Sequence, residues 1–113
     1  MGKRLVIPSD TTRYTLKDCR TFWSRLKGYM FDQEPMVQAV LLNHCSSIHT
    51  FGMRFALDVF FLDESNRVLQ EIRDVLPGKL LFSIKGTKHV LETPSGMLPS
   101  LKPDMQVRIE DET

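Results

Sequence analysis

The sequence lacks any long hydrophobic run and any strong excess of charge. No apolar stretch approaches the roughly 20 residues that a membrane-spanning helix needs, so we expect no membrane partner. The 15 Lys and Arg residues nearly balance the 14 Asp and Glu residues, and the formal net charge is +1. This balance disfavours a nucleic-acid partner, which would be held by a strongly basic surface. The first eight residues hold too few apolar side chains for a signal peptide, and we therefore expect a soluble, cytoplasmic protein.

The sequence also has few cysteines and lacks two common motifs of catalytic and phosphate-binding sites. The two cysteines, Cys19 and Cys45, are typical of buried or half-buried thiols that the cytoplasm keeps reduced, although a disulfide stays open because the sequence does not give the Cα separation. Cys45 and His49 form a C-x3-H element without a second ligand pair, so a zinc site is not expected. Neither a GxxxxGK[ST] phosphate loop nor a GxSxG nucleophile elbow occurs. We accordingly expect no metal and no cofactor.

What the chain does have is a series of short apolar segments broken by turn residues. Its length fits one domain that spans residues 1–113. One helix is predicted from about Asp18 to Gly28, with a capping box at residues 15–18. Strands are predicted at residues 4–8, 13–16, 37–42, 51–62, 68–75, 80–84, 88–93 and 105–109, the fifth joined to the fourth by a hairpin at 64–66.

The close spacing of these segments, without a β-α-β rhythm, favours an antiparallel or mixed sheet. We expect a mainly β or α+β fold: a compact, partly open, barrel-like sheet of about seven short strands with one short helix.

Two carboxylates, Asp58 and Glu92, stand inside predicted strands. A buried carboxylate is costly unless a cation or hydrogen bonds satisfy it. Structural pairing with Arg25, Arg54 or Lys88 is one explanation, and a functional site is the other.

Several segments of the chain resemble the DUF192 family. Residues 23–31 (WSRLKGYMF) are similar to the R-x-x-GLM segment that opens these domains. Residues 47–63 (SIHTFGMRFALDVFFLD) are similar to the central motif, in the variant written IHTFxMRFPLDVVFLD. Residues 89–96 (HVLETPSG) match the Y-VLELPAG signature, and residues 101–107 match the closing element loosely. The resemblance covers about residues 20–109 in the family's order.

The chain also departs from the family pattern at identifiable places. Ala56 stands where the motif carries proline, His89 replaces a common tyrosine, and Pro103-Asp104 replaces the final Gly-Asp turn. Many members carry a signal peptide or lipoprotein anchor, and no such segment is expected here. The resemblance implies a compact β-rich domain without an established enzymatic activity or an agreed ligand.

Among the positions that match the family motifs, five polar residues are explained least by packing. They are Arg25, His49, Arg54, Asp58 and Glu92, and we expect any ligand-binding site among them. Trp23 is added because its indole N–H needs a partner or water, which suits the wall of a groove.

The leading hypothesis is a small, monomeric, non-enzymatic binding or accessory domain. Its cluster of Arg25, Arg54, Asp58 and Glu92 either supports the barrel or frames a polar groove for a small polar ligand or a peptide. One alternative is a hydrolase-like or metal-assisted enzyme with His49 and either carboxylate as acid and base. The other is a structural protein-interaction module that pairs through an exposed sheet edge.

Overall fold

The computed structural model describes residues 2–9, 12–45 and 47–111, without the side chains of Phe22, Trp23 and Leu26. Within these residues, nine strands and one short helix are defined. The strands are β1 (Lys3–Val6), β2 (Arg13–Cys19), β3 (Ala39–Asn43), β4 (Ser47–His49), β5 (Leu57–Leu62), β6 (Val68–Val75), β7 (Leu80–Phe82), β8 (His89–Pro94) and β9 (Arg108–Asp111), and the helix is α1 (Phe22–Lys27).

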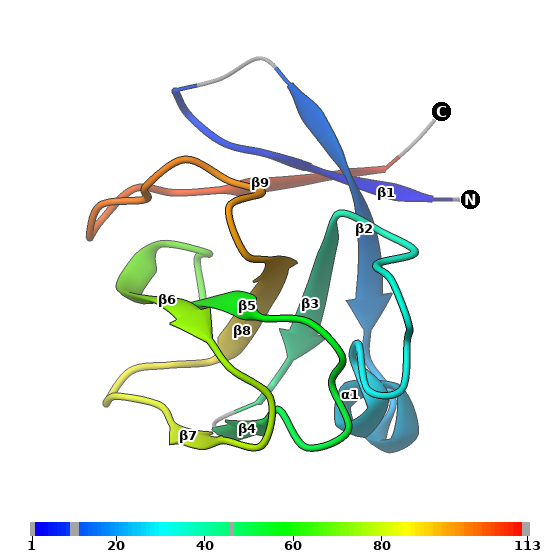
Figure 1. The fold of residues 1–113 in the computed structure, drawn as a ribbon. Helices are drawn as coiled ribbons and strands as arrows, with labels where there is room; N and C mark the ends of the chain where they lie inside the picture. The colour runs from blue at the N-terminus through cyan, green and yellow to red at the C-terminus, as the bar shows by residue number, and fades with distance from the viewer. Residues whose placement is uncertain (1, 10–11, 46, 112–113) are drawn as a thin grey trace.

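Seven of the strands form one curled sheet in the order β6-β5-β8-β3-β2-β1-β9, and β4 pairs with β7 as a separate ribbon (Figure 1). The sheet is not closed, because β6 and β9 are its edges. Neighbouring strands are antiparallel, apart from the parallel pair β2 and β3. The expected mainly β fold with a partly open, barrel-like sheet and one short helix is confirmed. None of the helical structure in the described ranges is long and apolar enough to cross a membrane.

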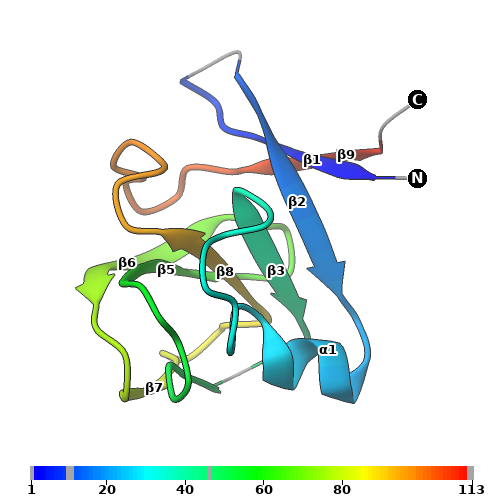
Figure 2. The ribbon, with the colours of Figure 1, turned by 45° about the vertical axis from the view of Figure 1, so that its right-hand side comes forward.

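The helix begins later in the chain than predicted. Residues 15–19 belong to β2, and α1 starts after Thr21, whose side chain accepts a hydrogen bond from the Ser24 N–H while Ser24 reaches back to the Thr21 backbone. Because β2 runs parallel to β3, the chain forms a β2–α1–β3 crossover, seen in Figure 2. The expected absence of a β-α-β unit was therefore wrong. Backbone pairing with β3 outweighed the local capping pattern at residues 15–18.

The long strand predicted at residues 51–62 is also shorter in the structure. Of the predicted range, only Leu57–Leu62 forms a strand, which is β5. The chain turns before it: Gly52 has a φ of +77°, and the Met53 N–H donates to the Thr50 carbonyl. Period-two alternation of apolar residues ran through this turn and hid it. The predicted β5–β6 hairpin is confirmed, whereas the last strand is displaced from 105–109 to β9.

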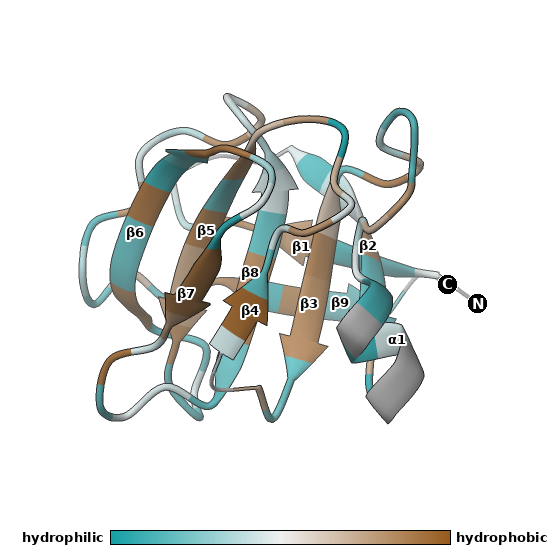
Figure 3. Cartoon of the chain, turned by 60° about the horizontal axis from the view of Figure 1, so that its bottom comes forward, coloured by the Kyte–Doolittle hydropathy of each residue, from teal (hydrophilic) through white to brown (hydrophobic). Residues whose placement is uncertain are grey.

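The sheet buries apolar side chains on both of its faces. Along β5, Val59 and Phe61 join one cluster while Phe60 and Leu62 join the other, as alternation on a strand requires. The cluster containing Val59 also includes Tyr29 and Ile48, from the layer formed by α1 and the β4–β7 ribbon. Figure 3 shows this layer lying over the sheet, with the apolar ribbon beside the helix. The candidate site lies in this second layer.

Candidate functional site

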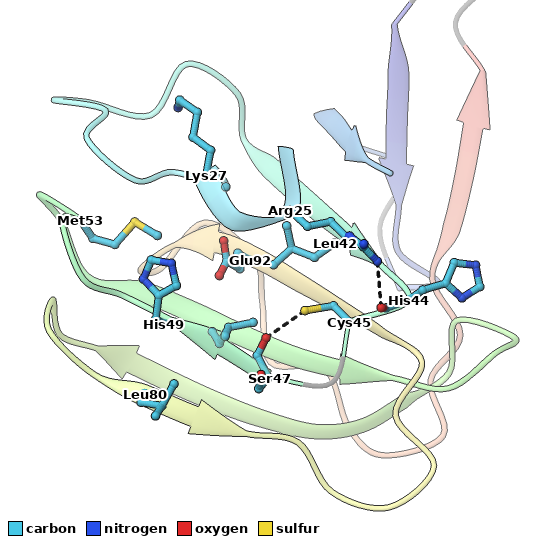
Figure 4. A pocket seen from close by; sticks show the side chains of 12 residues that line it. Arg25, Lys27, Leu42, His44, Cys45, Ser47, His49, Met53, Leu80 and Glu92 are labelled. Atoms are coloured by element: carbon cyan, nitrogen blue, oxygen red, sulfur yellow. Dashed lines mark hydrogen bonds between the residues drawn. The ribbon is translucent and has the colours of Figure 1, made fainter. Parts of the chain in front are cut away.

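A pocket of about 310 Å³ opens between α1, the end of β3 and the β4–β7 ribbon (Figure 4). Its apolar wall is formed by Leu42, Ile48, Met53 and Leu80. Its polar lining comes from Arg25, Lys27, His44, Cys45, Ser47, His49 and Glu92.

Glu92 is the buried polar group of this pocket. It lies on β8 between Val40 of β3 and Val59 of β5, and only 1% of its surface is exposed. Its Oε1 atom has no hydrogen-bond partner. Burial disfavours the charged form and raises the pKa of the Glu92 carboxyl to about 8, so this side chain is mostly a neutral acid at neutral pH.

Gly28, at the end of α1, provides the space for this carboxyl. A Cβ atom at Gly28 would lie 2.9 Å from Glu92 Oε1, and the backbone there has a φ of +46°. A residue with a side chain would both strain the backbone and press on the carboxyl. The helix end is thus shaped around Glu92.

Replacing Gly28 with alanine is expected to lower the free energy of unfolding by about 2 kcal/mol, because backbone strain at a φ of +46° and a ψ of −117° acts together with the contact with Glu92. The matched control is Gly78→Ala. Gly78 has a φ of +86° and open space where its Cβ would lie, so this variant should lose about 1 kcal/mol from strain alone. Urea unfolding of both variants measures the difference, and equal losses would show that Gly28 is not shaped around the carboxyl.

The cations of α1 differ in how they are paired. Lys27 Nζ lies 2.8 Å from Asp32 Oδ1 in an ion pair. Arg25 Nη1 donates to the carbonyls of Asn43 and His44, at 3.0 and 3.1 Å, and forms no ion pair with a carboxylate of the described residues. Arg25 therefore brings a positive charge to the pocket without an anion to balance it.

His49 and Cys45 line the pocket from β4 and the segment before it. The Nδ1 atom of His49 accepts a hydrogen bond from the Phe51 N–H at 3.2 Å, and the two rings stack at 5.5 Å between centroids. The Cys45 thiol donates to the Ser47 carbonyl, and burial raises the pKa of that thiol. A protonated thiol is a poor nucleophile at neutral pH. Cys45 and Cys19 are both free thiols, so no disulfide joins them.

Asp58 lies on the opposite face of the sheet from Glu92. It is fully buried and accepts three hydrogen bonds, from Arg73 Nη1 at 2.8 Å and from the N–H groups of Asp74 and Gly96 at 2.9 Å each. Its partner is Arg73, so the prediction of Arg25, Arg54 or Lys88 for this role was wrong. The predicted β5–β6 hairpin could have indicated Arg73, because the pairing of Leu57 with Val75 places it near Asp58.

The structure thus brings together three of the six candidate residues, Arg25, His49 and Glu92. Arg54 is exposed on the turn before β5 and does not line the pocket, so the cluster expected from Arg25, Arg54, Asp58 and Glu92 is not formed. The side chain of Trp23 lies outside the described residues.

Sequence reasoning missed Gly28 and the thiol of Cys45 as parts of this site. The turn at residues 50–56, whose Gly52 carbonyl accepts a hydrogen bond from the Phe31 N–H after α1, gave no signal in the apolar alternation. In the part of the chain that the structure describes, no group of three or more His, Cys, Asp or Glu side chains could hold a metal ion.

Comparison with known proteins gives relatives that carry no named activity. The model of the DUF192 family, described as "Uncharacterized ACR", matches residues 5–109. A UPF0127 protein of Thermococcus sibiricus is 28% identical over 100 residues, which are 84% of this chain and 64% of that protein. A UPF0127 protein of Pyrococcus horikoshii is 31% identical over 94 residues, which are 80% of this chain and 81% of that protein. The match spans less than two thirds of the first relative.

Two crystal structures share the fold. A candidate transcription regulator from Sinorhizobium meliloti superposes with a TM-score of 0.79 at 17% identity, over 95% of this chain and 91% of the other. A protein of unknown function from Novosphingobium aromaticivorans superposes with a TM-score of 0.76 at 19% identity, over 96% of this chain and 84% of the other. At these identities the likeness shows the fold alone. The family match over residues 5–109 and the 31% identical relative confirm the resemblance of the motifs, and the chain belongs to the uncharacterised DUF192 family.

Proposed function

We propose that this domain binds a small organic ligand in the pocket between α1 and the β4–β7 ribbon, through the carboxyl of Glu92. One observation carries the proposal: Glu92 Oε1 is buried at the wall of an open pocket without a hydrogen-bond partner. An unsatisfied buried polar group costs roughly 1–3 kcal/mol, and a ligand that bonds to it removes that cost. Native proteins seldom leave such a group without a reason.

The lining supports a small ligand with an apolar part. Leu42, Ile48 and Met53 line the pocket together with Glu92, and a few other polar groups line the same space. Small-molecule sites typically combine an apolar wall with a few placed polar groups in roughly 300–1,000 Å³. The pocket, at about 310 Å³, stands at the lower end of this range and fits a compact molecule.

Titration of the isotope-labelled chain with hexanoate, hexylamine, hexanol and hexanamide is expected to shift the backbone NMR signals of Gly28, Cys45 and His49 with at least one probe. The Glu92→Leu variant should lose the response, because it removes the hydrogen-bonding group and keeps an apolar side chain of similar length. The control is Glu110→Gln on β9, outside the pocket, which should respond as the original chain does. Pocket signals that no probe moves would contradict the proposal.

Catalysis in the same pocket is less well supported. His49 and Glu92 share the pocket, and a carboxyl with a pKa of about 8 suits a general acid. However, His49 Nδ1 accepts from the backbone, and no hydrogen bond joins the imidazole to a carboxylate of the described residues. Asp58, the other proposed partner of His49, is on the far face and fully engaged. These contacts favour binding over acid–base chemistry.

Docking of another protein is a second candidate function, favoured by exposed apolar side chains beside the pocket. Phe82 is 74% exposed, Phe31 65%, Leu80 54% and Phe51 52%. Exposed apolar clusters often mark interaction sites. Sedimentation measurements over a hundredfold range of concentration test whether the docked protein is a second copy of this chain. We expect a constant monomer mass, which would leave a different protein as the partner.

We further propose that this protein is cytoplasmic and binds neither nucleic acid nor membranes. The near-neutral charge and the two free thiols support this assignment.

A further inference from the structure

We propose that the pocket selects ligands that carry a carboxylate on a short apolar chain, the carboxylate sharing one proton with Glu92 and facing Arg25. This inference rests on the proposed function and names its ligand class. Two sources offer the same chemistry: a free short-chain acid and the C-terminal residue of a peptide.

The charge of the pocket favours an anion. Glu92 is the acidic residue among the described residues that line it, and it is neutral for most molecules at neutral pH. Lys27 is balanced by Asp32, whereas Arg25 has no carboxylate partner in the described chain. With Glu92 protonated, the lining carries one unbalanced positive charge. A cationic ligand would meet this charge and would also require Glu92 to lose its proton.

Hydrogen bonding points to the same class of ligand. A protonated carboxyl can donate one O–H, and a carboxylate is the strongest acceptor that a small organic molecule commonly offers. An O–H donor bonded to a carboxylate forms one of the short, strong hydrogen bonds. The unpartnered Oε1 of Glu92 can bond to the head group, and the charge of Arg25, whose guanidinium is held by the His44 carbonyl in Figure 4, acts on an anion in the same pocket.

The apolar wall indicates what the head group is attached to. Ile48 and Met53 are buried lining residues, and Leu80, which lines the same pocket, is 54% exposed. Phe51, stacked on the pocket residue His49, is 52% exposed. Covering such side chains removes apolar surface from water, which favours binding. A short aliphatic chain therefore gains affinity that acetate alone would lack.

Between pH 7 and pH 9, the cysteine and tyrosine side chains near Glu92 add little charge change of their own, so a change in ligand affinity can be assigned to Glu92. Burial raises the pKa of Cys19, Tyr29 and Cys45, which stay neutral over most of this range. The other charged or titratable residues that line the pocket are Arg25, Lys27, His44, Cys45 and His49, and the Glu92 carboxyl also acts electrostatically on Cys19 and Tyr29.

The test is an NMR titration of the whole chain with hexanoate, hexylamine and hexanol at several pH values. Hexanoate is expected to bind at least tenfold more tightly than the other two at pH 7. Its affinity should fall about tenfold from pH 7 to pH 9, because the protonated fraction of a carboxyl with a pKa of about 8 falls by that factor. In Glu92→Gln the amide still donates a hydrogen bond and cannot titrate, so binding of hexanoate should persist without this pH dependence.

Further probes distinguish a free acid from a peptide C-terminus, and two outcomes distinguish failure of the carboxylate class from failure of the proposed pocket. Acetyl-alanyl-leucine and its C-terminal amide identify a peptide source if the free acid binds more tightly than hexanoate and the amide does not bind. Preference for hexylamine, with affinity that rises with pH, would overturn the carboxylate class while leaving the proposed pocket in place. Absence of any shift at Gly28, Cys45 and His49 would overturn the proposed function as well.

Discussion

The Asp58→Ala variant is expected to lose about 3 kcal/mol of its free energy of unfolding. The substitution removes the buried carboxylate that accepts from Arg73 and from the N–H groups of Asp74 and Gly96. It leaves the N–H groups of Asp74 and Gly96 without their acceptor. Arg73, whose side chain is only 30% exposed, loses one of its two carboxylate partners and keeps Glu71. A buried N–H group without an acceptor costs its full desolvation, and two such groups together with the lost ion pair account for the expected decrease.

Asp63→Ala is the matched control for this measurement. Asp63 Oδ1 also accepts two backbone N–H bonds, from Ser65 at 2.8 Å and Arg67 at 2.9 Å, in the turn between β5 and β6. It is only half-buried, so water can replace it, and we expect a loss of about 1 kcal/mol. Urea unfolding at neutral pH compares the two variants. A loss at Asp58 no larger than that at Asp63 would contradict a structural role for the Arg73 pair.

The Glu92→Gln variant is expected to be more stable than the original chain by about 3 kcal/mol at pH 7. The pKa of Glu92 is raised from 4.5 to about 8 in the folded chain, so the unfolded chain releases this proton more readily than the folded one. The stability associated with the neutral carboxyl is fully present below pH 4.5 and is lost as the pH rises toward 8. Glutamine keeps the shape of the neutral acid and has no proton to lose.

The difference between the two chains should therefore depend on pH. It should be small near pH 4.5, grow through the neutral range and level off above pH 8. Denaturant unfolding at four pH values measures this profile, with Glu110→Gln as the control for the same substitution outside the pocket. A Glu92→Gln variant that is less stable than the original chain at every pH would contradict the claim that burial destabilises the charged Glu92 carboxylate.

A residue that lowers stability at working pH is expected at a functional site. Proteins commonly retain buried polar groups where binding or catalysis requires them and where packing alone would favour an apolar side chain. Asp58 and Glu92 show the contrast: one carboxylate is held by three donors, and the other has a buried oxygen without any. The first stabilises the sheet, and the second is available to a ligand.

The sequence predicted the class of fold and part of the site. Alternation and turn residues located the β5–β6 hairpin, and apolar flanks identified Asp58 and Glu92 as buried carboxylates. Alternation failed at residues 51–56, where a turn continues the same apolar pattern, and local capping failed at residues 15–18, where pairing with β3 decided the structure. Local patterns cannot report such long-range pairing.

The two carboxylates also show why the site could not be completed from sequence. Both stand in apolar strands, and their different roles depend on which face of the sheet each one meets. Asp58 points to the face where Arg73 lies, and Glu92 points to the face covered by α1. That difference arises from strand register and from the β2–α1–β3 crossover, neither of which the residue pattern contained.

The protonation state of Glu92 is the central claim of this account, and its direct measurement is a titration of the Glu92 side-chain carboxyl by carbon-13 NMR in the intact chain. We predict a single transition with a pKa of about 8, accompanied by shifts of the Gly28 backbone signals over the same range. A pKa near the ordinary glutamate value of 4.5 would contradict a buried neutral acid, and with it the proposed site for a carboxylate ligand.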